Sequence, residues 1–434
     1  MTQASPALPN DPNQRNGWKW WICFLLLLAT TLNYMDRQAL ALTKVRIGAD
    51  LGMDDAQYGE LIFVFNIGFG LGALLFGWLV DRVNLRWLYA GLVLTWSVVG
   101  FATGFVTTIA ALLLCRLLLG LFEAGNWPCG IMTVKRVLPP EHRSLGNGVF
   151  QSGTALGAIL MPLFLLLCFQ FVDSNDKRAW QMPFRIVGAA GIFWVVLWLS
   201  TVRGGRVEAQ PPAVDARRDD SSYWSLWRER RFYVMIVVIV SVNTPWRTFA
   251  EWLPSFLQKG KGYSEQTTQL YTSAYYFAAD AGSILAGIIT LRLVRRGKSL
   301  FSSRMFSLLL CASLTVLTTV AVLLPQGWLL FAVLLLIGFG ALGSFSSYFA
   351  FSQDVSMKHQ GKLTGTLGLI NAMCMGGLAL LQGQLIKATK SYDIALGLTG
   401  VVPLLGVAAI WFFWNPPPGE KKPEQALGDS ASVK

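Results

Sequence analysis

Apolar stretches of about 20 residues recur along the whole chain, separated by short polar segments. A helix of about that length crosses the hydrocarbon core of a bilayer. The pattern therefore predicts an all-α membrane protein with twelve transmembrane helices. The predicted spans are residues 18–42, 56–80, 86–107, 109–134, 144–171, 181–202, 231–257, 265–291, 302–324, 328–352, 362–386 and 394–414.

Composition and charge agree with this pattern. The chain of 434 residues is 53% hydrophobic and 14% charged, whereas soluble domains are about one quarter charged. The net charge of +12 first suggests a nucleic-acid partner, but 24 of the 36 Lys and Arg residues lie in loops and tails predicted to be cytoplasmic, against 8 in outer loops. Such a positive-inside bias explains the basic charge without nucleic acid. We expect a multi-pass protein of a bacterial inner membrane, surrounded by lipid, with both termini cytoplasmic.

A long polar segment at 203–230 divides the chain into halves that resemble each other weakly. At an offset of 210 residues, Arg37 aligns with Arg247 and Gly77 with Gly287. Repeated halves are typical of transporters that rock about a central site. The predicted parts are a cytoplasmic tail (1–17), a six-helix bundle (18–202), a cytoplasmic loop (203–230), a second, pseudo-symmetric six-helix bundle (231–416) and a second cytoplasmic tail (417–434).

The first predicted helix carries charged residues where a membrane helix is normally apolar. Asn33, Tyr34 and Arg37 are spaced by three and four residues and share one face, with Asp36 about 100° to the side. A charge at the centre of a membrane costs on the order of 3 kcal/mol, so such residues usually face a protein interior or a watery cavity. This helix is therefore predicted to line a central cavity.

The fourth predicted helix repeats this feature, with Arg116, Gly120 and Glu123 on one face. A guanidinium group can grip a carboxylate with two parallel hydrogen bonds, and a buried carboxyl group can exchange a proton. These residues are therefore expected to bind an anion and to couple its movement to protons. The alternative is that they neutralise one another as buried ion pairs that hold the helices together.

Several motifs resemble the major facilitator superfamily, specifically its anion:cation symporters. They read "LNYMDRQALAL", "GWLVDRVNLR", "CRLLLGLFEAGNWPCG" and "EHRSLGNGVFQSGTALGAILMP". "GNWP", "WLPSFLQ" and "AADAGS" are similar to the hexuronate transporter branch. The resemblance implies the major facilitator fold and alternating access. It also implies that Arg37 binds the substrate carboxylate and that Asp36 and Glu123 take part in proton coupling.

The chain departs from the family pattern in its predicted gating loop. That loop usually reads Gly-x-x-x-Asp-Arg-x-Gly-Arg, and here Asn84 and Leu85 replace the last Gly-Arg. The resemblance assigns the gating role to Asp81, Arg82 and Arg86.

Two further departures concern the cavity. Phe69 stands where the family often has a tyrosine, which removes one expected hydroxyl contact to substrate. Arg247 and Glu251 interrupt a stretch that is usually aromatic or aliphatic in the family. Their i, i+4 spacing allows them to pair with each other, and Arg247 is equally a candidate for binding substrate.

Other polar or aromatic side chains predicted to face the cavity could bind substrate hydroxyls or stack on a sugar ring. The alternative for each aromatic residue is packing or anchoring at the membrane interface. With Arg37, Arg116 and Arg247, the candidate substrate-binding residues are Asn33, Tyr34, Gln151, Trp246, Tyr275, Tyr276 and Asn371. Asp280 in "AADAGS" either lines the cavity or supports a gate.

The sequence favours a monomeric, proton-coupled symporter of a small organic anion such as a hexuronate or another sugar acid. Alternatives are an exchanger of organic phosphates or dicarboxylates, and a membrane sensor, for which the central loop leaves no room for an output domain. An enzyme is disfavoured because no nucleophile–base pair or phosphate-binding glycine loop occurs. The six cysteines lie in predicted helices without paired spacing, so we expect no disulfide, metal or cofactor.

Overall fold

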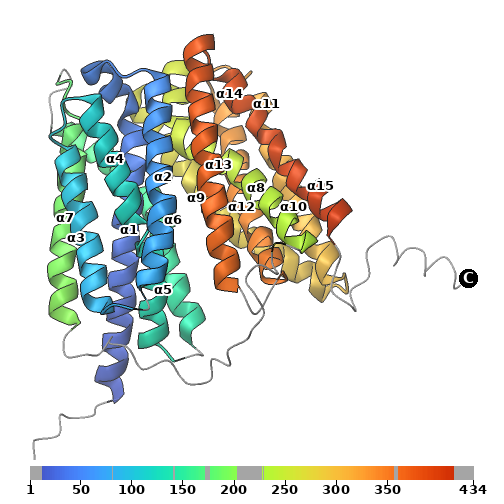
Figure 1. Ribbon diagram of the computed structural model, residues 1–434. Helices are drawn as coiled ribbons and strands as arrows, with labels where there is room; N and C mark the ends of the chain where they lie inside the picture. Colours follow the sequence, from blue (N-terminus) through green and yellow to red (C-terminus); the bar gives the residue numbers. More distant parts are fainter. Residues whose placement is uncertain are drawn as a thin grey trace, which may run out of the picture.

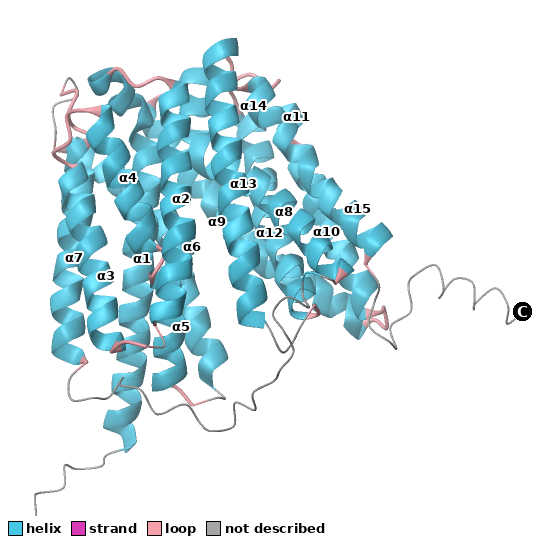
Figure 2. Cartoon of the chain, viewed as in Figure 1, coloured by secondary structure: helices cyan, strands magenta, loops and turns pink. Residues whose placement is uncertain are grey.

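The computed structural model is helical throughout the part of the chain that it describes, with no strand in that part (Figure 2). The described residues are 12–80, 82–139, 142–171, 176–202, 227, 229–355 and 360–414. The helices are α1 (Pro12–Leu51), α2 (Asp55–Leu79), α3 (Leu85–Thr103), α4 (Ile109–Glu123), α5 (Asn126–Val137), α6 (Arg143–Gln170), α7 (Gln181–Thr201), α8 (Arg230–Ser255), the π-helix η3 (Phe256–Gly260), α9 (Glu265–Arg295), α10 (Leu300–Val316), α11 (Thr318–Ala321), α12 (Trp328–Gln353), α13 (Gln360–Thr389), α14 (Asp393–Gly397), the 3₁₀ helix η4 (Leu398–Val401) and α15 (Val402–Phe413).

Eleven helical segments of the described chain are long and apolar enough to cross a membrane. Some of them join consecutive helices, such as α4 with α5 and α8 with η3. The remaining long helix is α1, which has 40 residues and carries Arg37, Lys44 and Arg46 in its second half. The predicted all-α membrane fold is confirmed. The first span was predicted to end at residue 42, yet the helix continues to Leu51, because its backbone hydrogen bonding does not stop where polar side chains begin.

The helices form two groups that lie side by side. Helices α1 to α7 occupy one side and α8 to α15 the other, and α11 and α15 are inclined to the helices of the first group (Figure 1). Contacts between the groups are made by α2 with α13, α6 with α9 and α1 with α8. The proposed domain limits remain predictions, since the central loop is described only at 227 and from 229 onward, and residues 1–11 and 415–434 lie outside the description.

Glycines bring α2 and α4 into close contact. A Cβ atom at Gly120 of α4 would lie 2.1 Å from the carbonyl oxygen of Phe65, and one at Gly68 of α2 would lie 2.4 Å from that of Leu117. Any side chain at either position would force the helices apart. Small residues at such crossings allow membrane helices to pack backbone against backbone. The crossing places Arg116 and Glu123 of α4 close to α1 and α2.

Polar contacts join the two helix groups at the end where α1 stops and α2 begins, which we call the joined end. Arg46 of α1 forms an ion pair with Glu265 of α9 at 2.6 Å. Asp54, which caps α2, pairs with Lys387 of α13 at 2.7 Å. These pairs close this end of the interface between the groups.

Lys44 lies at the centre of the joined end and is 2% exposed. Its Nζ atom donates to Asp55 Oδ1 at 2.5 Å and to Ser255 Oγ at 3.3 Å. The ammonium group also lies 4.1 Å from the ring centre of Trp252 and 4.5 Å from that of Tyr58. Because Ser255 and Trp252 belong to α8, this lysine of α1 binds residues of both groups.

Candidate functional site

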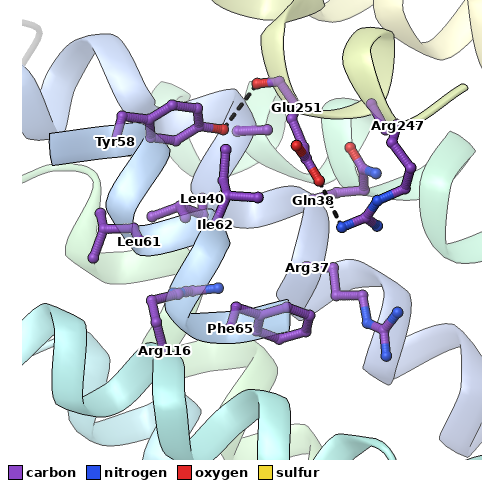
Figure 3. A pocket seen from close by; sticks show the side chains of 12 residues that line it. Arg37, Gln38, Leu40, Tyr58, Leu61, Ile62, Phe65, Arg116, Arg247 and Glu251 are labelled. Atoms are coloured by element: carbon purple, nitrogen blue, oxygen red, sulfur yellow. Dashed lines mark hydrogen bonds and ion pairs between the residues drawn. The ribbon is translucent and has the colours of Figure 1, made fainter. Parts of the chain in front are cut away.

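A pocket lies between the two helix groups, next to the joined end (Figure 3). The space in it that is open to the centre of a water-sized sphere is about 50 Å³ in this conformation. Helices α1, α2, α4 and α8 form its wall. The lining residues are Arg37, Gln38, Leu40, Ala41, Tyr58, Leu61, Ile62, Phe65, Arg116, Arg247, Ala250 and Glu251.

Arg37 of α1 is held by a carboxylate and by aromatic rings. Its Nε atom donates to Glu123 Oε2 of α4 at 2.8 Å. The guanidinium carbon lies 4.5 Å from the ring centre of Phe69, 5.2 Å from that of Phe65 and 5.4 Å from that of Tyr34. The buried Nη2 atom has no hydrogen-bond partner among the described residues. Arg37 is therefore fixed in place and still has donors to offer.

Arg116 of α4 is 2% exposed, and neither its Nε nor its Nη2 atom has a hydrogen-bond partner in the described part of the chain. Its guanidinium carbon lies 5.6 Å from the ring centre of Phe184. A buried charged group without hydrogen bonds is costly, so it points to a partner that enters the pocket. An anionic ligand would satisfy these donors.

Neither Asp36 nor Asn33 of α1 is among the side chains that line the pocket. Asp36 packs against α3, where a Cβ atom at Gly100 would lie 3.2 Å from its Oδ1 atom. Both polar atoms of the Asn33 side chain, and Asp36 Oδ1, are buried without hydrogen-bond partners among the described residues. Together with Glu123, whose Oε1 atom has no partner in the described part of the chain either, they form a buried polar region behind the pocket.

Arg247 and Glu251 of α8 face the pocket from the other helix group (Figure 3). Arg247 Nη2 lies 2.5 Å from Glu251 Oε1, so the two side chains form the i, i+4 ion pair that their spacing allows. Tyr58 of α2 donates its hydroxyl hydrogen to the backbone carbonyl of Glu251 at 2.8 Å. This bond ties the two helix groups together at the pocket wall.

The structure places the other candidate residues outside the pocket lining. Tyr275 is fully buried, and its ring stacks on that of Phe249 with 5.6 Å between the ring centres. Tyr276 donates to Gln38 Oε1 at 2.8 Å and also contacts the ring of Trp246, so it supports the pocket from behind.

Three further polar candidates also lie away from the pocket lining. Gln151 of α6 is exposed, and Asn371 of α13 and Asp280 of α9 are half-buried. None of the three is among the side chains that line the described pocket. Their proposed roles as substrate or gate residues remain predictions.

The predicted gating loop is only partly described. Asp81 lies outside the described residues. Arg82 Nη1 donates to the carbonyl of Trp78 at 2.8 Å, and Arg86 Nη2 donates to that of Leu199 at 3.0 Å. Arg86 thus links α3 to α7 in this conformation.

Two polar residues of the pocket lining, Gln38 and Tyr58, were not predicted from the sequence. Gln38 follows Arg37 directly, and Tyr58 lies in the first turn of α2, so neither shares the helical face used to select candidates. The position of Gln38 directly after the charged residues Asp36 and Arg37 could have indicated that it lines the pocket. Within the described residues, no three His, Cys, Asp or Glu side chains are grouped as metal ligands.

The sequence and the fold both resemble those of known proteins. The family model described as Major Facilitator Superfamily matches residues 26–380. The chain belongs to this superfamily. Structures with the same fold include a bacterial homologue of the human lysosomal transporter Spinster in an inward-facing conformation, with a TM-score of 0.74 at 18% identity over 92% of this chain and 96% of that chain. The inward-open xylose transporter XylE from Escherichia coli has a TM-score of 0.74 at 12% identity, covering 94% and 99% of the two chains.

Curated members of the superfamily align over nearly the whole chain. A probable L-galactonate transporter of Escherichia coli K12 is 26% identical, over 91% of this chain and 88% of its own. A probable galactarate/D-glucarate transporter of Bacillus subtilis is 26% identical over 94% and 96%. The hexuronate transporter of Escherichia coli K12 is 24% identical over 96% and 98%. The resemblance to transporters of the anion:cation symporter type is confirmed, and the chain is a membrane transporter, not an enzyme.

Proposed function

We propose that this superfamily member carries a sugar acid, such as a hexuronate, across the membrane by alternating access, together with a proton. The observation that carries this proposal is Arg116, whose buried guanidinium lines the pocket with two donor atoms unpartnered among the described residues. Arg37, in the same lining, contributes a further donor without a partner in the described part of the chain. Two arginines in the lining of one pocket suit a carboxylate, because guanidinium groups bind it through paired, charge-assisted hydrogen bonds. The relatives described above carry sugar acids by name.

Proton coupling follows from the charges behind the pocket. When Asp36 and Glu123 are both ionised, they offset Arg37 and Arg116, and the site attracts an anion weakly. A proton on either acid leaves net positive charge and favours the anion. Binding of proton and substrate is then reciprocally linked, as symport requires.

The decisive experiment is uptake of labelled galacturonate, glucuronate and galactonate into proteoliposomes with an imposed pH gradient. We expect accumulation of at least one acid when the proton gradient is inward and loss of accumulation when a protonophore collapses it. Exchange that ignores the gradient would instead establish an anion exchanger. No movement of any of the three acids would refute the substrate class.

We further propose that the protein works as a monomer in the bacterial inner membrane with both termini in the cytoplasm. The lysines and arginines concentrated in the predicted inner loops support this orientation. A cysteine introduced in the 203–230 segment should react with an impermeant maleimide only after the membrane is opened. Labelling of intact cells would reverse the orientation.

A further inference from the structure

The Arg247–Glu251 pair of α8 lies in the pocket although the resemblance to the family predicts an apolar segment there. Two pocket arginines, Arg37 and Arg116, come from the first helix group, and Arg247 comes from the second. Cationic donors therefore face the same space from both groups. A ligand with a single carboxylate would engage only one of these sides.

Arg247 can accept a ligand without giving up its present partner. The shortest contact of Glu251 is with its Nη2 atom, and a guanidinium group has five N–H donors arranged along more than one edge. The Arg247 side chain is 23% exposed, which leaves part of it open to the pocket. Glu251 therefore orients the guanidinium, as expected for a binding residue fixed by a neighbouring carboxylate.

The opposite side of the pocket has the same construction. Glu123 holds Arg37 through Nε, and Arg37 Nη2 remains unpartnered among the described residues. Each helix group thus presents an arginine that a glutamate of its own group orients, and Arg116 adds to the first group further donors that no described residue accepts. Tyr58 and Gln38 also line the pocket, and their polar groups, which bond to the Glu251 carbonyl and to Tyr276, are of the kind that bind the hydroxyl groups of a polyol chain (Figure 3).

From this arrangement we infer that the preferred substrate carries an acidic group at each end: a dicarboxylic sugar acid, with one carboxylate on Arg37 and Arg116 and the other on Arg247. This inference rests on the proposed function and narrows its substrate class. A bridging ligand would also engage both helix groups at once.

The test compares two six-carbon acids that differ at one terminal carbon. Galactarate has a carboxylate at both ends, whereas galactonate, also an open-chain acid, has a carboxylate at one end and a hydroxymethyl group at the other. Binding to the purified, full-length protein is measured by titration calorimetry at one pH. We expect galactarate to bind at least about tenfold more tightly, because one additional charge-assisted contact of about 1.5–3 kcal/mol corresponds to at least that ratio.

Variants at Arg247 locate the source of the preference. In Arg247→Gln, the ratio of the two dissociation constants should fall to about one. If the glutamine variant does not fold, Arg247→Lys takes its place, because it keeps a positive charge beside Glu251. It should also reduce the ratio, because an ammonium group cannot form the paired bonds. Arg295→Gln, at an exposed position of α9, is the matched control and should keep the wild-type ratio.

The outcomes are distinct. Equal affinity of wild-type protein for both acids, or an unchanged ratio in both Arg247 variants, would overturn this inference and leave the proposed function standing. Tighter binding of glucose 6-phosphate than of galactarate would indicate that the site prefers a phosphate ester to a second carboxylate. That result would also overturn the inference. Absence of binding by either acid would contradict the proposed function itself.

Discussion

At the scale of single residues, the surroundings of Arg37 determine what can replace it. One edge of its guanidinium is bonded to Glu123, and three aromatic rings surround the group. Lysine preserves the charge but has a compact head that can neither bridge a carboxylate nor stack flat on rings. The position therefore requires the shape of arginine as well as its charge.

We predict that Arg37→Lys lowers uptake of sugar acid at least about tenfold, since it loses charge-assisted hydrogen bonds of about 1.5–3 kcal/mol. Uptake and binding are measured on the same proteoliposome preparation, with Arg295→Lys as the control for the substitution itself. Normal substrate binding by Arg37→Lys would assign Arg37 to structural pairing with Glu123.

A second prediction at this scale concerns Glu123. Glu123→Gln mimics a permanently protonated acid, so the variant should still exchange labelled for unlabelled substrate but should not accumulate it under a pH gradient. Counterflow needs only alternating access, whereas gradient-driven uptake also needs coupling. Full gradient-driven accumulation would remove Glu123 from the proton path and leave Asp36 as the candidate.

Part of the site could be predicted from the sequence because charges in a membrane helix have few explanations. Arg37, Arg116 and Arg247 were all singled out in this way, and all three line one pocket. Spacing along one helix gave no information about which helix packs behind which. Tyr275 therefore was a plausible ligand in the sequence, although α12 covers it, with the backbone of Gly338 against its ring.

At the scale of helices, the position of the site depends on the crossing of α2 and α4. Gly120 lies between Arg116 and Glu123 on α4, at the point of closest approach to α2. A change there moves both charged side chains together. The apolar pattern predicts that these helices exist, but it contains no information on how closely two of them approach.

We predict that Gly120→Ala destabilises the protein by about 1–3 kcal/mol, as overpacked positions do, because its Cβ would lie 2.1 Å from the Phe65 carbonyl oxygen. Substrate binding should weaken as well. Gly91→Ala in α3 is the control, since nothing lies within 4 Å of a Cβ there. Thermal unfolding in detergent measures both variants, and equal midpoints would show that the crossing can relax.

The start of α2 gives a prediction on pH. The Lys387 ammonium group and the backbone N–H of Gln57 lower the pKa of Asp54 below its ordinary value. Because the pKa of Asp54 is lower in the folded than in the unfolded protein, its ionised carboxylate stabilises the folded state at pH values above the unfolded pKa of about 3.9. This contribution is lost as the pH falls through the pKa of the folded state. Asp54→Asn should therefore lower the unfolding midpoint slightly at neutral pH, and the difference should vanish in strong acid. A difference that persisted in acid would exclude the ionised carboxylate as its source.

At the scale of the whole molecule, the joined end closes one route to the pocket. Arg46, Lys44 and Asp54 of the first group contact Glu265, Ser255 and Lys387 of the second. Alternating access requires that these contacts break when the pocket opens toward that side. This closing role could not be predicted from the sequence, because each of these residues lies near the end of a helix, where charged residues are usual.

We predict that Glu265→Arg, which places two arginines opposite each other, shifts the population toward opening at the joined end. The labelling rate of a cysteine introduced at Leu61, in a background without native cysteines, should rise by roughly threefold, in keeping with the modest value of exposed ion pairs. The swapped pair Arg46→Glu with Glu265→Arg should restore slow labelling. Identical labelling of the single variant and the parent would show that this ion pair does not hold the end closed.

The prolines of α8 have a mechanical consequence. Pro245 and Pro254 lie on either side of the stretch that bears Arg247 and Glu251, and a π-helical turn follows at Phe256. Each proline removes one backbone hydrogen bond and weakens the helix at that point. We therefore expect the segment between the two prolines to tilt as a unit while the rest of α8 stays packed. Replacing Pro254 by alanine should make this segment of α8 less able to bend, and should slow transport more than it weakens substrate binding.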